Sequence, residues 1–250
     1  MTEPQPHPGR AAEPGAIRKR RAMDISIIGS GSIGGTLAEQ LAGRGHTVTI
    51  ANSRGPASLA ELANRTGATA AETAEAVGRA QVLIVSVPSG ALPGLGRTVE
   101  KHLPAGAVVI DTSNYVPELR DQPIAAIDDG LPEGLWVARQ LNRPIIKALN
   151  TVGAASLASG GRPRGDSRRI AAPVSGSDAA AKRTVIALLD EIGFDGFDAG
   201  DLDNSWRQEP GTPVYTADLP LGQARKAIDE AMRGDTAAWR ERIRSTAKRQ

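Results

Sequence analysis

The sequence predicts an α/β fold with a doubly wound, mostly parallel sheet, helices on both faces and a C-terminal helical extension. Three observations lead to this prediction. Short apolar runs alternate with helical patterns along the chain. A glycine-rich turn follows the first apolar run, and several later runs end in small polar residues. This pattern is typical of sheets whose ligands lie beyond the carboxyl ends of the strands.

The glycine-rich turn predicts a dinucleotide site. A strand at 24–28 runs into Gly29, Gly31 and Gly34, and a helical pattern follows through 36–41. In a Rossmann-type turn the first glycine allows a tight bend, the second lets backbone amides approach a pyrophosphate, and the third packs helix against strand. The strand before the turn and the helix after it make the motif specific.

The end of the second strand indicates which dinucleotide is bound. The strand at 47–51 runs into Asn52, Ser53 and Arg54, and no carboxylate occurs before Glu61. Chains that select NAD place Asp or Glu here to bind the ribose 2′-hydroxyl. A guanidinium at Arg54 and a hydroxyl at Ser53 favour the 2′-phosphate of NADP instead.

The rest of the chain continues the alternation. We expect further strands at 68–70, 82–87, 108–111, 145–149 and 169–174, with helices at 59–65, 72–79 and 179–192. Asp178 is the expected N-cap of the last of these helices. The run at 82–87 has the composition of a central strand that is buried on both faces.

Strand ends supply further candidate contacts. Val87 and Pro88 follow the central strand, so we expect them beside the cofactor. Asn150 follows the strand at 145–149, where it either orients the nicotinamide carboxamide or forms a turn. Trp206 and Arg207 are candidate substrate contacts, because aromatic residues are scarce and Trp206 with Tyr215 would make a wall for a flat ring; ordinary core packing is the alternative.

Composition limits the other functions. The chain of 250 residues has no cysteine, and His7, His46 and His102 are spaced too far apart for a ligand set, so we expect no metal. The positive charge is concentrated in residues 1–22 and 240–250, which argues against nucleic-acid binding. We find no membrane span or signal peptide, and expect a cytoplasmic protein.

The predicted organisation has three parts. Residues 1–22 form a disordered leader, 23–210 a reductase domain of Rossmann type, and 211–250 a helical extension. An amphipathic helix at 224–232 breaks near Gly234 and resumes around Trp239, a pattern that suits a homodimer. The arginines of loop 160–169 suit either an anionic substrate tail or a solvated surface.

Seven motifs in order, SGSIG, NSRGP, VPS, DTSN, IIKALNTV, PVSGSDAAAK and EIGFDGFDAG, carry a family resemblance across about residues 23–210. They resemble the NADP oxidoreductases that depend on the deazaflavin coenzyme F420, and are also similar to the cytosolic reductase domain of the STEAP metalloreductases. The resemblance implies three groups of cofactor contacts, with the pyrophosphate at Ser30, Ser32 and Ile33, the 2′-phosphate at Ser53 and Arg54, and the nicotinamide at Val87 and Pro88. It also adds weight to Asn150.

The chain departs from that family at several positions. Archaeal members often carry His where Asn150 stands and Lys where Ser58 stands, and the segment 205–215 is unlike theirs. These departures concern the second substrate more than NADP.

Three functions therefore stay open. The first is hydride transfer between NADPH and a deazaflavin or flavin-like acceptor, which needs geometry and no catalytic acid or base from the protein. The second is NADPH-dependent reduction of small imines or carbonyls. The third is a non-catalytic NADPH sensor.

Overall fold

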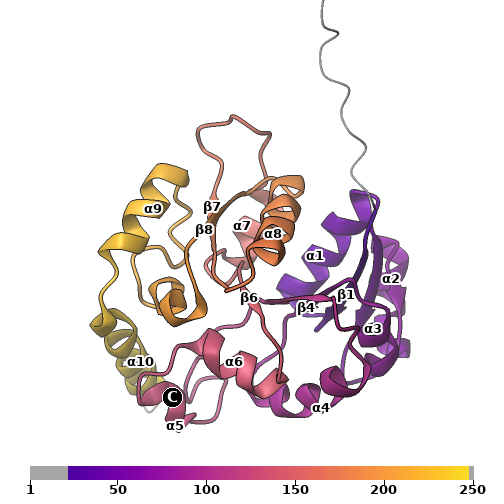
Figure 1. Cartoon of the computed structure of the whole chain (residues 1–250), viewed down its shortest axis with the longest axis horizontal. Coiled ribbons are helices and arrows are strands. Elements are labelled where there is room, and N and C mark those ends of the chain that lie inside the picture. The colour runs from indigo at the N-terminus through magenta and orange to yellow at the C-terminus, as the bar shows by residue number, and fades with distance from the viewer. Residues whose placement is uncertain (1–21, 248–250) are drawn as a thin grey trace, which may run out of the picture.

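The computed structural model describes residues 22–247, so the leader predicted at 1–22 lies outside it except for residue 22. Within this part of the chain, the main sheet has six parallel strands in the order β3-β2-β1-β4-β5-β6 (Figure 1). The strands are β1 (Asp24–Ile28), β2 (Thr47–Ala51), β3 (Thr69–Ala70), β4 (Val82–Val85), β5 (Val108–Asp111) and β6 (Ile146–Lys147). The predicted doubly wound parallel sheet is confirmed, and its strand order reverses between β1 and β4.

Helices cover both faces of this sheet. One face is packed by α1 (Ser32–Gly43), α7 (Ala154–Ser159) and α8 (Ala179–Glu191). The other is packed by α3 (Thr73–Arg79), α4 (Leu92–His102) and α6 (Glu133–Leu141). The shorter helical segments are η1 (Pro56–Leu59), α2 (Ala60–Thr66), η2 (Ser89–Ala91), α5 (Ala125–Asp128) and η3 (Leu202–Gln208).

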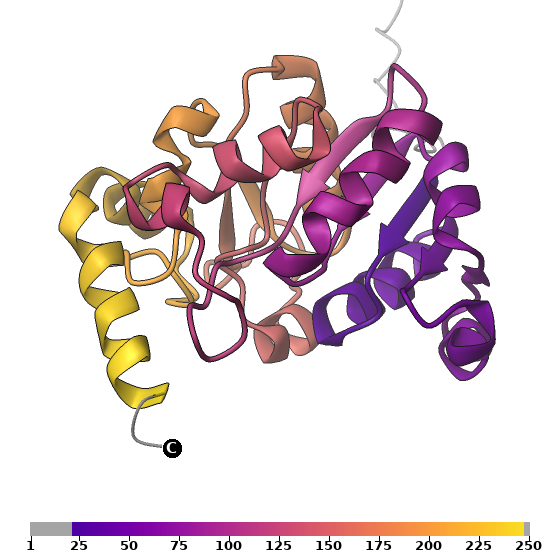
Figure 2. The same ribbon diagram turned by 90° about the horizontal axis from the view of Figure 1, so that it is seen from below.

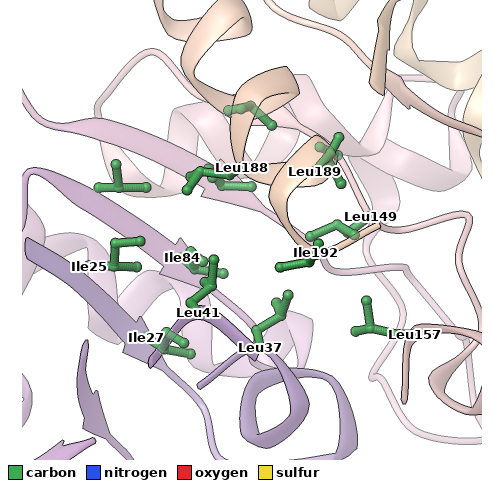
Figure 3. Close-up of a cluster of buried hydrophobic side chains, with 14 of the residues drawn as sticks. Ile25, Ile27, Leu37, Leu41, Ile84, Leu149, Leu157, Leu188, Leu189 and Ile192 are labelled. Atoms are coloured by element: carbon green, nitrogen blue, oxygen red, sulfur yellow. The ribbon is translucent and has the colours of Figure 1, made fainter. Parts of the chain in front are cut away.

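The central strand β4 is buried on both faces, as its composition predicts. Ile84 belongs to the core under α1 and α8, whereas Leu83 and Val85 belong to the core under α3 and α4. Figure 3 shows the first of these cores, in which Leu37 of α1 and Leu188 of α8 belong to the same cluster of buried side chains as Ile84. This packing holds the turn between β1 and α1 in place at the carboxyl end of the central strand β1.

A second, smaller sheet pairs β7 (Ala171–Val174) with β8 (Asp195–Asp198) in parallel. An isolated antiparallel bridge between Lys147 and Ser175 connects it to β6. Asp178 caps α8 as predicted, because its Oδ1 accepts hydrogen bonds from the amides of Ala180 and Ala181 at 2.7 and 3.0 Å.

Four strands are shorter than the sequence predicts. The strand expected at 68–70 starts at Thr69, and the one expected at 82–87 ends at Val85. The strand expected at 145–149 stops at Lys147, and Leu149 takes a left-handed conformation with φ of +65° that ends the extended run. The strand expected at 169–174 starts at Ala171. The guanidinium of Arg169 turns instead to Asp190 and Asp195, each at 2.9 Å.

The C-terminal extension forms α9 (Leu221–Glu230) and α10 (Arg233–Ala247). Ala224, Ala227 and Ile228 pack α9 against β7. Figures 1 and 2 both show these two helices at the end of the molecule opposite to α2. Across residues 22–247 no helix is long and apolar enough to span a bilayer, and no group of three acidic, His or Cys side chains suits a metal ion.

Candidate functional site

The glycine turn after β1 has the geometry that its sequence predicts. Gly29 has φ of +111°, and its amide donates to the carbonyl oxygen of Ala51 at 2.8 Å. A Cβ on Gly34 would lie 2.0 Å from the Gly29 carbonyl oxygen, so α1 approaches the turn as closely as a glycine allows. Nothing lies within 4 Å of the Cβ position of Gly31, which leaves that side of the turn open.

A cavity of about 510 Å³ opens beside this turn. It lies between the ends of β1, β2 and β4 and the first turns of α4. Seven of the sequence-predicted residues line it together, namely Gly29, Ser30, Gly31, Ser53, Arg54, Val87 and Pro88. A neighbouring hollow of about 280 Å³ contains Ser32 with Ser30, Gly31 and Arg65. Ile33 and Gly34 lie in the first turn of α1, just behind the glycine turn.

Asn52 organises the end of β2, where NAD-selective chains carry a carboxylate. Its Nδ2 donates to the Ser30 hydroxyl and to the Ser58 hydroxyl, both at 3.0 Å. Its Oδ1 accepts from the Arg54 amide at 2.9 Å. Asn52 therefore connects the glycine turn to the loop that carries Arg54. The sequence did not indicate this role for Asn52.

The groups around the cavity fit an anionic nucleotide. Arg54 is exposed, and within residues 22–247 its guanidinium has no hydrogen bond or ion pair. The N-terminus of α1 begins at Gly31 with no side-chain cap, so its first amides are not satisfied by the protein. An open glycine, uncapped amides and an unengaged guanidinium are together suited to a pyrophosphate and a further phosphate.

A family model described as NADP oxidoreductase, coenzyme F420-dependent, matches residues 24–115. A crystal structure from Arthrobacter sp. FB24, assigned as an F420-dependent NADP reductase, is 25% identical and superimposes with a TM-score of 0.62. The superimposed region covers 74% of this chain and 87% of the Arthrobacter chain. Residues 24–115 therefore belong to this family of F420-dependent NADP oxidoreductases.

Two other proteins are similar to this family member. The structure of SMa0349 from Sinorhizobium meliloti is 30% identical, covers 80% of this chain and 96% of its own, and has a TM-score of 0.69. YjhV of Escherichia coli (strain K12) is 34% identical over 76 residues, which are 30% of this chain and 56% of that protein. The match to YjhV therefore spans little more than half of its length.

In this member of the family, Asn150 lies apart from the cavity. It is 3% exposed, and its Nδ2 donates to Asn114 Oδ1 at 3.1 Å and to the Gln208 carbonyl at 2.7 Å. Its Oδ1 accepts from Gln208 Nε2 at 2.8 Å. The carboxamide is thus held by two partners inside the protein, and Asn114 is the partly buried member of the group.

Trp206 and Arg207 also lie away from the cavity. Both belong to η3, and Trp206 is buried between the guanidinium groups of Arg207 and Arg233, at 4.6 and 4.5 Å from its ring centre. Arg207 Nη1 donates to the carbonyl oxygen of Ile228, near the end of α9, at 3.1 Å. The structure therefore groups these two residues with the C-terminal helices, whereas Tyr215 makes an edge contact with Trp239 at 6.2 Å.

A buried ionic cluster, which we call the core cluster, was missed by sequence reasoning. Its members are Asp111, Glu133, Lys147, Glu209 and Arg240. Lys147 Nζ donates to Asp111 Oδ2 at 2.7 Å, and both side chains are 0% exposed. Arg240 lies between Glu133 and Glu209, with Nη2 at 3.1 Å from an oxygen of each.

Burial governs the charges in the core cluster. Burial, followed by repulsion from Glu209, raises the pKa of Glu133 from 4.5 to about 8, against the opposing effects of Lys147 and Arg240. Burial also raises the pKa of Glu209. Although burial acts to lower the pKa of Lys147, the carboxylates of Asp111 and Glu133 outweigh it and raise that pKa. Lys147 therefore stays charged, while the charge on either glutamate affects the protonation of the other.

Proposed function

We propose that the protein transfers hydride between NADPH and a deazaflavin such as coenzyme F420, or a flavin-like acceptor. The observation that carries this proposal is the unengaged Arg54 beside Ser53, at an end of β2 without a carboxylate and in one cavity with the glycine turn. Membership of an NADP oxidoreductase family supports it. NADPH, when bound, supplies the hydride from C4 of its nicotinamide.

The residues that would hold the cofactor follow from the cavity. Arg54 and Ser53 would bind the 2′-phosphate by charge-assisted hydrogen bonds, with Asn52 fixing their loop through its bonds to Ser30 and Ser58. The open face at Gly31 and the uncapped amides of α1 would hold the pyrophosphate, together with Ser30, Ser32 and Ile33.

The protein would contribute positioning and exclusion of water rather than proton transfer. Among the residues described around the cavity, Arg54 is the one with a titratable side chain. Val87 and Pro88 present apolar surface at the carboxyl end of β4, where the nicotinamide half would pass. Such a site suits direct hydride transfer, in which the reacting carbons must be held about 3 to 3.5 Å apart.

The experiment is stopped-flow mixing of the NADPH-loaded protein with a panel of acceptors. The panel contains coenzyme F420, FMN, FAD, a ferric chelate, a cyclic imine and a small ketone. Absorbance loss at the NADPH band with F420 or a flavin supports the proposal. Turnover with the imine or ketone alone favours a small-molecule reductase, and binding without turnover across the panel favours a sensor.

The same proposal includes a cytoplasmic homodimer. A second copy would close the acceptor side, since substrate clefts often lie between units in proteins of this kind. Met232, 67% exposed between α9 and α10, is an apolar residue available for such a contact. Light scattering coupled to size-exclusion chromatography tests it, and a monomeric mass would exclude the dimer.

A further inference from the structure

Two chains of hydrogen bonds run from the C-terminal helix α10 to the loop after β5, and both begin at Arg240. This arginine is 6% exposed although it lies in the last helix of the described chain. Its Nη1 donates to the Ile127 carbonyl at 3.1 Å, which fixes the guanidinium between α5 and α6. Nη2 is then directed at Glu133 and Glu209.

The first chain passes through Glu133. Arg240 Nη2 donates to Glu133 Oε1 at 3.1 Å, and the other carboxylate oxygen accepts from the amide of Tyr115 at 3.1 Å. Tyr115 directly follows Asn114. The guanidinium of Arg240 also lies 5.4 Å from the Tyr115 ring centre. Arg240 therefore contacts the side chain of Tyr115 directly and its backbone amide through Glu133.

The second chain passes through Glu209 and its neighbour Gln208. Arg240 Nη2 donates to Glu209 Oε2 at 3.1 Å. Gln208 holds Asn150 by the two bonds described above and is fixed in turn by the Ser175 hydroxyl, which donates to its Oε1 at 2.6 Å. Asn150 and Asn114 then pair reciprocally, since Asn114 Nδ2 donates to the Asn150 carbonyl at 2.9 Å.

Both chains therefore end at Asn114, the member that is only partly buried. It stands three residues beyond β5, at the carboxyl edge of the sheet and two strands away from the glycine turn. Bound ligands lie over this edge, with the adenine half at the β2 side and the reacting half toward β5. Both ends of the Asn114 carboxamide are held by Asn150, so this partly exposed side chain has a fixed orientation at the carboxyl edge of β5.

We propose that Arg240 is a positioning residue for the reacting half of the site, acting on Asn114 through Glu133 and Gln208. This inference rests on the proposed function, because it assumes a dinucleotide across the carboxyl edge. It gives α10, which lies beyond the residues matched by the family model, a part in the reaction. None of the residues in these two chains lines the cavity at Arg54, so that cavity does not depend on Arg240.

The test compares Arg240→Met with Arg240→Lys and with the control Arg244→Met. Arg244 lies one turn further along α10 and pairs with Asp128 at 2.5 Å. Its loss weakens the docking of the helix and removes a contact with the Tyr115 hydroxyl, but leaves in place every hydrogen bond that links Arg240 to Asn114. Calorimetry measures affinity for 2′,5′-ADP, which contains only the adenine half, and for NADPH. Steady-state kinetics with the best acceptor give kcat and KM.

We expect R240M to keep its affinity for 2′,5′-ADP within about twofold and to lose kcat on the order of 10- to 100-fold, since a small misplacement of the reacting groups has that effect. The ratio of the affinity for NADPH to the affinity for 2′,5′-ADP should decrease in the same variant. R240K, which keeps the charge, should recover most of the loss, and R244M should match the wild type.

If R240M does not fold, Asn150→Ser breaks the second chain without leaving a buried carboxylate unpaired, and it should show the same pattern. The inference would be overturned if R240M, or N150S in its place, had the same kcat as the wild type and the same ratio of affinities for NADPH and 2′,5′-ADP. The proposed function would remain intact. Equal losses in R240M and R244M would reduce Arg240 to a purely structural role. A wild type that binds NADPH no better than 2′,5′-ADP and turns over no acceptor would refute both.

Discussion

Gly29 lies so close to Ser86 that a Cβ atom on it would stand 2.0 Å from the Ser86 carbonyl oxygen. The contact joins the ends of β1 and β4, the two strands between which the sheet reverses its order. Gly31, two residues further, has nothing within 4 Å of its Cβ position. The fold therefore requires a glycine at position 29, whereas the open space at Gly31 is available to a ligand.

This difference predicts opposite effects of the same substitution. Gly29→Ala should lower the free energy of unfolding by about 3 kcal/mol or more, because the methyl group meets backbone atoms at a positive φ. Gly31→Ala should change it by less than about 0.5 kcal/mol, yet weaken NADPH binding, because its methyl group occupies the approach to the pyrophosphate. Urea denaturation and calorimetry on both variants check the pair, and a G31A protein with wild-type affinity would contradict it.

Arg54→Ala should weaken NADPH binding and leave NADH binding unchanged. A charge-assisted bond to phosphate is worth about 1.5 to 3 kcal/mol, so the expected loss is about 10- to 150-fold. Arg79→Ala is the matched control, since Arg79 is an exposed arginine on α3 that pairs with Glu75. A loss of the same size for both nucleotides would show that Arg54 does not contact the 2′-phosphate.

Much of the fold was predictable because local patterns agree with the tertiary structure. The strands at 24–28, 47–51 and 108–111 are observed with the predicted bounds, and Asp178 caps its helix. The helices at 92–102 and 133–141 were missed, since Pro93 and the glycines of the first and the short pattern of the second obscure their periodicity.

The site was predictable where contacts are local in sequence and unpredictable where they are not. The glycine turn and the loop of Ser53 and Arg54 are short segments whose neighbours are fixed by β1 and β2. Asn150, in contrast, is held by Gln208 from 58 residues further along. The ion pair of Lys147 could not be predicted from the sequence either, because its partner Asp111 lies on another strand.

Lys147→Met should strongly destabilise the protein. It leaves Asp111 charged and fully buried, which costs about 3 to 5 kcal/mol when one partner of a buried pair is removed. The double variant Lys147→Met with Asp111→Asn should recover most of the loss, because Asn can still accept the Ser113 amide hydrogen bond now made by Asp111 Oδ1 at 2.9 Å. Thermal unfolding of both variants provides the measurement; equal melting temperatures for the single and double variants would argue against the pairing.

Glu133→Gln should flatten the pH dependence of stability. The pKa of Glu133 is raised from 4.5 to about 8, so the folded state favours its protonated form. Its contribution to the free energy of unfolding is full below pH 4.5 and is lost as the pH rises toward 8. Urea titrations between these limits should show a steeper decline for the wild type than for the variant, and parallel declines would mean that Glu133 does not titrate there.

We propose that this chain selects the phosphorylated dinucleotide through Arg54 at the end of β2. Calorimetric titration of the wild-type protein with NADPH and with NADH tests it most directly. We expect NADPH to bind tighter than NADH by about 10- to 150-fold, the difference expected from one arginine–phosphate contact. Equal affinities, or tighter binding of NADH, would contradict it.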